Sequence, residues 1–202
     1  MIKQYNYVPF LDDGEPVTYN NFYYWNGVFS NEDCDKIIQL GFQYRMQDAT
    51  VESAGYAKLS VDEQVRRSKI AWMAFNDNTA WIYERIHEYA VKTNREMKWD
   101  FSLYGFIDHL QFTEYKSEYK GHYGYHHDIV ANTTIRKLSC VLQLSEETDY
   151  TGGDFEFPGV GTVTKKRGSL IYFPSFLVHR VLPVLSGTRY SLVSWISGPK
   201  FV

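Results

Sequence analysis

From about Phe101 onward, apolar and polar residues alternate along the sequence, whereas in earlier segments apolar residues recur every three to four positions. Alternation of this kind is typical of strands, and turn signals such as Thr151-Gly152-Gly153 and Ser186-Gly187 separate the segments. The predicted strands span residues 102–115, 122–130, 136–145, 153–157, 169–173, 178–184 and 188–197. Short strands that follow leading helices favour an α+β chain, mainly β, with N-terminal helices packed on one sheet of a jelly-roll or barrel.

Two helices and one strand are expected ahead of the β-rich region. Ser30 has the character of an N-cap, with Asp33 three residues later in a capping-box position. The buried stripe of this first helix is expected at Cys34, Ile37, Ile38 and Gly41. A second helix should begin near Asp77-Asn78 and bury Ile82, Ile86 and Tyr89. Between the two helices, Ser68 to Phe75 is predicted to form a strand.

The length of 202 residues is enough for one well-packed domain. Residues 1–21 are rich in Tyr and Asn and are expected to form an extended arm. We find no internal repeat, low-complexity run or linker in the remainder. The prediction is therefore a single domain over residues 22–202.

Charge and cysteine content narrow the classes of protein to which the chain can belong. A formal net charge of −3 argues against a general nucleic-acid binder, which is usually basic. No stretch approaches transmembrane length, and no signal peptide is apparent. Cys34 and Cys140 sit in apolar patterns without metal-type spacing, which favours buried free thiols in a reducing compartment. We expect a cytoplasmic protein with no nucleic-acid or membrane partner.

A His-x-Asp triplet and a distant histidine form a candidate metal site. Alternate side chains of a strand share one face, so His126 and Asp128 project together while His127 points away. His179 lies in another strand-like run and can complete the set if both strands belong to one barrel. Two imidazoles and one carboxylate make the facial triad that holds non-haem Fe(II) and leaves coordination positions open.

A candidate anion site follows on the last predicted strand. Parity places Arg189, Ser191, Val193 and Trp195 on one face. A guanidinium and a hydroxyl two residues apart can grip a carboxylate between the sheets. Each element alone has an ordinary explanation, because a lone histidine is usually packed and a lone arginine usually forms a salt bridge. Their order, strand placement and shared parity together favour a functional site.

The sequence resembles the 2-oxoglutarate- and Fe(II)-dependent dioxygenases, in particular the prolyl-4-hydroxylase-like branch. The resemblance covers roughly residues 22–199. The segments that carry it are Trp25-Asn26-Gly27-Val28-Phe29-Ser30, Arg66 to Trp72, Gln111 to Tyr115, Gly121 to Asp128, Gly152 to Phe157, Arg167 to Ser175, His179-Arg180-Val181 and Gly187 to Leu192. It implies a double-stranded β-helix fold with Fe(II), 2-oxoglutarate and O2 as cofactor and co-substrates, and with ascorbate as an accessory.

The resemblance also implies roles for individual residues. It places the metal ligands, which are also the catalytic residues, at His126, Asp128 and His179. It places 2-oxoglutarate binding at Arg189, Ser191, Tyr115 and Gln143. Gln143 stands where animal relatives often carry Tyr, and the segment from Tyr115 to Gly121 is longer than in many relatives. It places Tyr123 and Trp195 against the substrate.

The expected activity is hydroxylation of a C–H bond, with peptidyl proline as the first candidate, coupled to decarboxylation of 2-oxoglutarate to succinate and CO2. A free amino acid or another small molecule is the alternative substrate. A nucleic-acid demethylase is a weaker alternative, since Trp195 stands where alkylation-repair relatives carry a second Arg. From another class, a non-catalytic jelly-roll binding module also remains open. The sequence does not indicate an oligomeric state.

Overall fold

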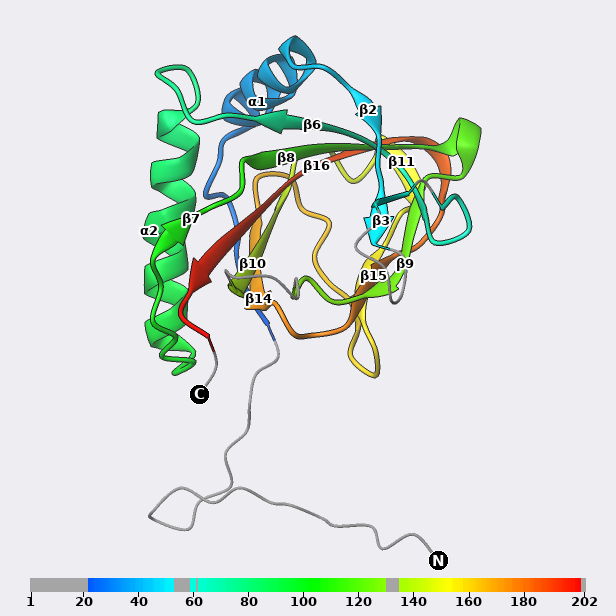
Figure 1. Ribbon diagram of the computed structural model, residues 1–202. Helices are drawn as coiled ribbons and strands as arrows, with labels where there is room; N and C mark the ends of the chain where they lie inside the picture. The colour runs from blue at the N-terminus through cyan, green and yellow to red at the C-terminus, as the bar shows by residue number, and fades with distance from the viewer. Residues whose placement is uncertain (1–21, 53–58, 61, 130–134, 201–202) are drawn as a thin grey trace, which may run out of the picture.

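A computed structural model describes residues 22–52, 59–60, 62–129 and 135–200. The arm predicted at residues 1–21 lies outside this range. Two α-helices, α1 (Asn31–Gln43) and α2 (Ala80–Glu96), are described together with a short 3-10 turn, η1 (Ser117–Tyr119). In Figure 1, α2 runs along one side of the molecule and the strands β9 (His122–His126) and β15 (His179–Val181) lie at the opposite side.

The larger of the two main sheets has nine strands, and every pairing in it is antiparallel. Its central path runs β1 (Tyr23–Trp25), β14 (Leu170–Pro174), β10 (Ile135–Gln143), β16 (Val184–Gly198), β8 (Leu110–Lys116), β6 (Lys69–Met73) and β2 (Gln47–Asp48). The short strands β11 (Tyr150–Gly152) and β7 (Gly105–Phe106) also pair with β16. The long strand β16 therefore organises this sheet.

The smaller main sheet has five antiparallel strands in the order β13 (Gly161–Thr162), β12 (Phe155–Phe157), β15, β9 and β5 (Arg66–Arg67). A separate hairpin joins β3 (Val51–Glu52) to β4 (Leu59–Ser60). Both described α-helices pack on the larger sheet, and the architecture is the mainly β, double-stranded β-helix expected from the sequence.

Strand alternation gives the large sheet one apolar face and one mixed face. On β8, Leu110 and Phe112 join the cluster that packs against α1 and α2, whereas Gln111 and Thr113 point to the opposite side. Gly41 of α1 makes this packing tight, because a Cβ there would lie 2.5 Å from the Phe112 ring. The mixed face therefore lies opposite the small sheet, where its polar side chains can line a site.

The helix boundaries confirm the sequence signals for capping. Ser30 caps α1, since its Oγ accepts from the Asp33 amide at 3.1 Å and the Asp33 carboxylate accepts from the Ser30 amide. Of the predicted stripe, Ile38 is only partly buried and Leu40 takes its place. In α2, Ile82 and Ile86 are buried as expected, but Tyr89 is only partly buried.

Two predicted turns lie instead within paired strands. β11 includes Thr151 and Gly152, and β16 continues through Ser186 and Gly187. At Gly187 a Cβ would lie 1.9 Å from the Asp149 carbonyl oxygen, and φ is +70°. The glycine thus allows close approach of the two strands, and its presence does not mark a loop.

Both cysteines are free and fully buried, as predicted. Burial raises the pKa of the Cys34 thiol to about 11 and that of the Cys140 thiol to about 12. At pH 8 we therefore expect the native protein to resist modification by a chromogenic disulfide reagent, and the unfolded chain to release reporter from both thiols. Rapid modification without denaturant would contradict this burial.

Within the described residues, no helix combines the length and apolar character needed to cross a membrane.

Candidate metal centre

The two predicted histidine ligands are direct partners in the small sheet. His126 at the end of β9 pairs in register with His179 at the start of β15, and the centroids of their rings are 4.2 Å apart. Antiparallel pairing places side chains at opposed positions on the same face. Residues more than fifty positions apart in sequence thus converge as expected.

Backbone hydrogen bonds orient both imidazoles. His126 Nδ1 lies 2.8 Å from the Gly124 carbonyl oxygen, and His179 Nδ1 lies 2.9 Å from that of Leu177. A carbonyl only accepts, so Nδ1 of each ring carries the proton and Nε2 keeps its lone pair. Both Nε2 atoms therefore present a ligand atom on the side where Asp128 lies.

Asp128 completes the cluster from just beyond the end of β9. Its Oδ1 is 3.6 Å from His126 Nε2, and its Oδ2 is 3.7 Å from His179 Nε2. The candidate ligand atoms of the three residues lie within 4.8 Å of one another. Two imidazoles and one carboxylate fit a divalent metal ion, and this donor set is the one expected for Fe(II) with open positions.

Burial and neighbouring charges keep the ligands in their metal-binding forms. Burial lowers the pKa of His126 well below its ordinary value, and the neighbouring His179 adds to the effect. For Asp128, burial acts to raise the pKa, but His179, His126 and the Ser139 hydroxyl together outweigh it and lower the pKa. A neutral imidazole beside an ionised carboxylate is ready to bind a cation.

Aromatic side chains surround the cluster. The Phe173, Phe155 and Phe157 ring centroids lie 4.7, 5.5 and 6.1 Å from that of His179. Tyr123 stacks on His126 with centroids 3.4 Å apart. This apolar lining excludes water from one side of the site and strengthens the electrostatic interactions inside it.

Arg189 of β16 is a buried cation that forms no ion pair with any residue that the structure describes. Only 1% of its surface is exposed. It donates hydrogen bonds to two neutral groups, the Gln143 Oε1 at 2.9 Å and the Ser191 Oγ at 3.4 Å. Within the described part of the chain its Nε has no hydrogen-bond partner. Because a buried guanidinium is unfavourable unless paired, this arrangement fits a carboxylate that arrives with a ligand.

The other predicted co-substrate residues surround this guanidinium. The Tyr115 ring centroid is 5.4 Å from the Arg189 guanidinium carbon. Gln143 and Ser191 are register partners on β10 and β16. The Gln143 amide also donates to the Thr164 carbonyl oxygen at 3.1 Å, which fixes its orientation. Gln143 thus holds Arg189 in place, a contact that the sequence alone did not predict.

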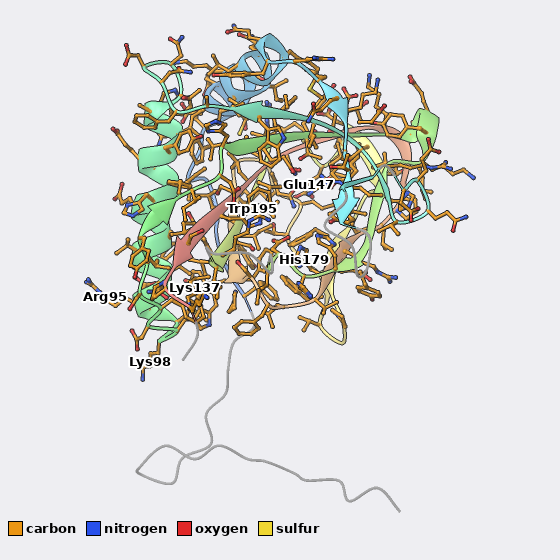
Figure 2. All side chains as sticks on the ribbon, viewed as in Figure 1. Arg95, Lys98, Lys137, Glu147, His179 and Trp195 are labelled. Carbon is orange, nitrogen blue, oxygen red and sulfur yellow. The ribbon has the colours of Figure 1, made fainter. Side chains whose placement is uncertain are left out.

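Tyr123 and Trp195, predicted to face the substrate, occupy the same interior. Figure 2 shows Trp195 and His179 inside the β-sandwich, whereas Arg95 and Lys98 extend from the end of α2. The indole of Trp195 is buried, and its Nε1 has no hydrogen-bond partner among the described residues. The Arg136 guanidinium stacks on this indole, with its central carbon 3.8 Å from the ring centroid. The indole also lies close enough to Asp128 to help lower the pKa of its carboxyl, so Trp195 stands beside the candidate metal ligands.

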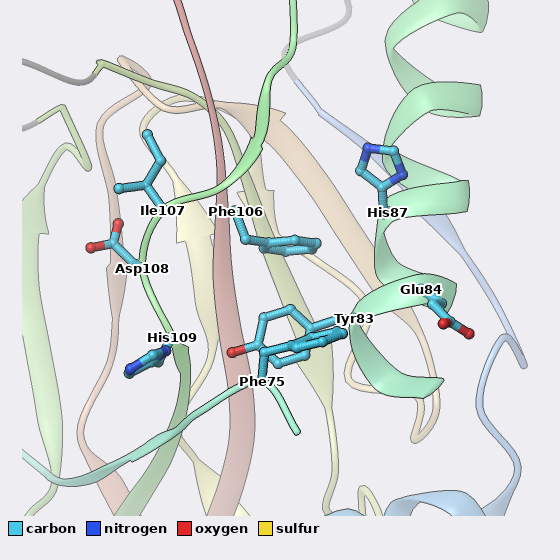
Figure 3. A pocket seen from close by; sticks show the side chains of 8 residues that line it. All are labelled: Phe75, Tyr83, Glu84, His87, Phe106, Ile107, Asp108 and His109. Atoms are coloured by element: carbon cyan, nitrogen blue, oxygen red, sulfur yellow. The ribbon is translucent and has the colours of Figure 1, made fainter. Parts of the chain in front are cut away.

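The remaining histidines lie outside the cluster. His127 is exposed, as parity predicts, and both ring nitrogens of His122 contact backbone carbonyl oxygens. A surface pocket of about 440 Å³ opens elsewhere, between α2 and the segment before β8 (Figure 3). It is lined by Phe75, Tyr83, Glu84, His87, Phe106, Ile107, Asp108 and His109. Its Tyr83 hydroxyl is engaged by backbone groups, so we place the chemistry at the cluster and not at this surface pocket.

Sequence reasoning missed two serines at the cluster. Ser139 and Ser175 are fully buried and hydrogen-bonded to each other, and Ser139 reaches Asp128. Ser139 shares strand parity with Gln143 on β10, which is the signal that points to the inner face. Ser175 lies just after β14, where no periodicity applies.

Comparison with known protein families finds a match in the β-rich region of the chain. The model of the 2OG-Fe(II) oxygenase superfamily matches residues 110–197. A PKHD-type hydroxylase of Synechococcus sp. (strain CC9311) is 36% identical over 85 residues, which is 40% of this chain and 39% of that protein. A PKHD-type hydroxylase of Shewanella baltica (strain OS155) is 38% identical over 82 residues, 37% of each chain. The match thus spans about two fifths of the length of these curated relatives.

Solved structures with the same fold cover most of the chain. A viral collagen prolyl hydroxylase from Paramecium bursaria Chlorella virus-1, solved with 2OG, has a TM-score of 0.66 at 21% identity and covers 89% of this chain and 97% of its own. A Pseudomonas putida prolyl-4-hydroxylase has a TM-score of 0.67 at 19% identity, with 89% and 94% covered. A Trichoplax adhaerens prolyl hydroxylase bound to a hypoxia inducible factor peptide has a TM-score of 0.70 at 15% identity, with 88% and 83% covered.

Proposed function

We propose that the protein is an Fe(II)- and 2-oxoglutarate-dependent dioxygenase that hydroxylates a C–H bond, because residues 110–197 match the model of the 2OG-Fe(II) oxygenase superfamily. One observation carries the proposal. A cluster of two histidines and one carboxylate at the small sheet shares the interior with Arg189 on the large sheet, which is buried and has no carboxylate partner among the described residues. A metal site alone does not need the arginine, whereas a dicarboxylate co-substrate bound at the metal does.

The residues divide the work of binding. His126, Asp128 and His179 would hold Fe(II), which with O2 and 2-oxoglutarate supplies the oxidising chemistry that yields succinate, CO2 and a hydroxylated substrate. Arg189, positioned by Gln143 and with Ser191 beside it, binds the far carboxylate of 2-oxoglutarate and so sets its orientation. The surrounding aromatic rings keep bulk water away from the reacting groups.

Peptidyl proline is the substrate that we propose first, with Tyr123 and Trp195 as its contacts. Two similar folds belong to a collagen prolyl hydroxylase and to a prolyl hydroxylase with a bound peptide, which supports this choice by analogy. A free amino acid or another small molecule is the alternative. A non-catalytic binding module is less well supported, because it would not require the buried Arg189. We further propose a cytoplasmic location and a single domain over residues 22–202.

The function is tested by incubating the protein with Fe(II), 2-oxoglutarate, ascorbate and a proline-containing peptide library. We expect mass spectrometry to find peptides that gain one oxygen atom, with succinate formed in step. Reactions without 2-oxoglutarate serve as controls. Oxygen gain in free amino acids but not in peptides would favour the alternative substrate. Absence of 2-oxoglutarate binding to the metal-loaded protein would favour the binding module.

Gln143 provides a smaller test of the co-substrate site. Gln143→Leu removes the hydrogen bond that positions the Arg189 guanidinium, and we expect 2-oxoglutarate affinity to fall about fivefold, or about 1 kcal/mol. The affinity is measured by calorimetric titration of Mn(II)-loaded protein. Gln39→Leu on the exposed side of α1 is the matched control and should leave it unchanged. Equal affinities for the two variants would show that Gln143 does not position Arg189.

A further inference from the structure

Asp128 differs from the two histidines in how its position is fixed. His126 and His179 lie within paired strands, whereas Asp128 follows the end of β9. Its backbone amide donates to the Ser175 carbonyl oxygen at 2.9 Å. Its side chain accepts a hydrogen bond at Oδ2 from the Ser139 Oγ at 2.6 Å. Ser139 on β10 and Ser175 just beyond β14 therefore hold a residue that is not itself in a strand.

A second hydrogen bond supports the first. Ser139 and Ser175 Oγ atoms are 2.9 Å apart, and both residues are fully buried. An ionised carboxylate can only accept, so Ser139 uses its single hydroxyl proton for Asp128. Ser139 must then accept from Ser175. The chain of donors runs from Ser175 to Ser139 to Asp128, and Ser175 fixes both the backbone and, through Ser139, the side chain.

We propose that Ser139 and Ser175 are positioning residues that hold Asp128 Oδ2 and leave Oδ1 to bind the metal ion alone. The inference rests on the proposed function, because it needs the metal. A carboxylate that binds through one oxygen takes one coordination position, whereas a chelating carboxylate takes two. The serines thereby keep open a position that the co-substrate or oxidant needs. Hydrogen-bonded partners of this kind orient metal ligands in general.

Cobalt(II) titration tests the proposal without relying on activity, because this ion reports its coordination through visible absorption. Ser139→Ala should weaken Co(II) affinity about tenfold or more, because the Asp128 carboxylate is no longer held in its binding orientation. It should also alter the visible spectrum, because Oδ2 is then free to chelate the ion. Ser139→Thr keeps the hydroxyl and should restore both. Ser175→Ala, which removes only the supporting donor, should weaken affinity about threefold.

Ser194→Ala is the matched control. Ser194 is equally buried, lies on β16, and its Oγ has no hydrogen-bond partner among the described residues. The Ser194→Ala substitution should leave the Co(II) affinity and the visible spectrum unchanged. The unfolding temperature of each metal-free variant shows whether that variant is folded. A Ser139→Ala protein with the affinity and spectrum of the wild type would overturn the proposal. If that variant does not fold, unchanged Co(II) affinity of Ser175→Ala overturns it. Wild-type protein that binds no Co(II) would instead overturn the metal site itself.

Discussion

Replacing His126 by alanine is expected to abolish 2-oxoglutarate turnover and to weaken metal binding by at least about a hundredfold. Removing a hydrogen-bonded neighbour of a ligand typically weakens a metal site by about ten- to a hundredfold, so the loss of one ligand in three should exceed that range. His126 and His179 face each other on the paired strands β9 and β15, and among the described residues only Asp128 joins them in the cluster. A neighbouring side chain therefore cannot replace the lost nitrogen.

His127→Ala is a control that the chain itself offers. It removes the same side chain one position further on, where the imidazole is exposed and outside the cluster. Succinate formation and Mn(II) affinity should remain at wild-type levels in this variant. Both quantities can be measured on the same preparations by chromatography and calorimetry. Substantial turnover by His126→Ala, or equal losses in the two variants, would refute the assignment of His126 as a ligand.

Replacing Arg189 by alanine is expected to lower 2-oxoglutarate affinity at least tenfold, or about 1.4 kcal/mol, while metal affinity stays the same. The guanidinium is buried and has no carboxylate partner among the described residues, so its full charge is available to the ligand. In a low-dielectric interior, such a charge-assisted pair is stronger than one at the surface.

Calorimetric titration of Mn(II)-loaded protein with 2-oxoglutarate measures this effect. Arg85→Ala is a suitable control, because Arg85 on α2 pairs with Asp33 on the helical side of the large sheet. It removes an equal charge away from the site and should not change the titration. An unaltered titration for Arg189→Ala would mean that the co-substrate carboxylate binds elsewhere.

Parity explains why so much of the metal centre could be predicted from the sequence. A side chain on a strand has only two faces, so one residue assigned to the interior fixes its alternate neighbours. This rule placed His126 on the inner face and His127 outside. It also placed Arg189, Ser191 and Trp195 together on β16. The α1 cap could be predicted because capping depends on residues only three positions apart.

Features that depend on distant strands could not be predicted in the same way. Gly187 has the composition of a turn, but its role is to let the Asp149 backbone approach closely. The Gln143–Arg189 hydrogen bond depends on the register of β10 against β16, which no local pattern encodes. Ser175 lies beyond a strand end, so its approach to Ser139 follows from tertiary packing alone.

The candidate metal ligands lie at the small sheet, whereas Arg189, which is proposed to bind a carboxylate, lies on the large sheet. A molecule that engages both would act as a tie across the interior. Unfolding would then have to break that tie, so metal and dicarboxylate together should raise the melting temperature more than the sum of their separate effects. Succinate, which lacks the keto group, should give a smaller increment. Thermal denaturation could thus report occupancy of the interior before any hydroxylated product is known.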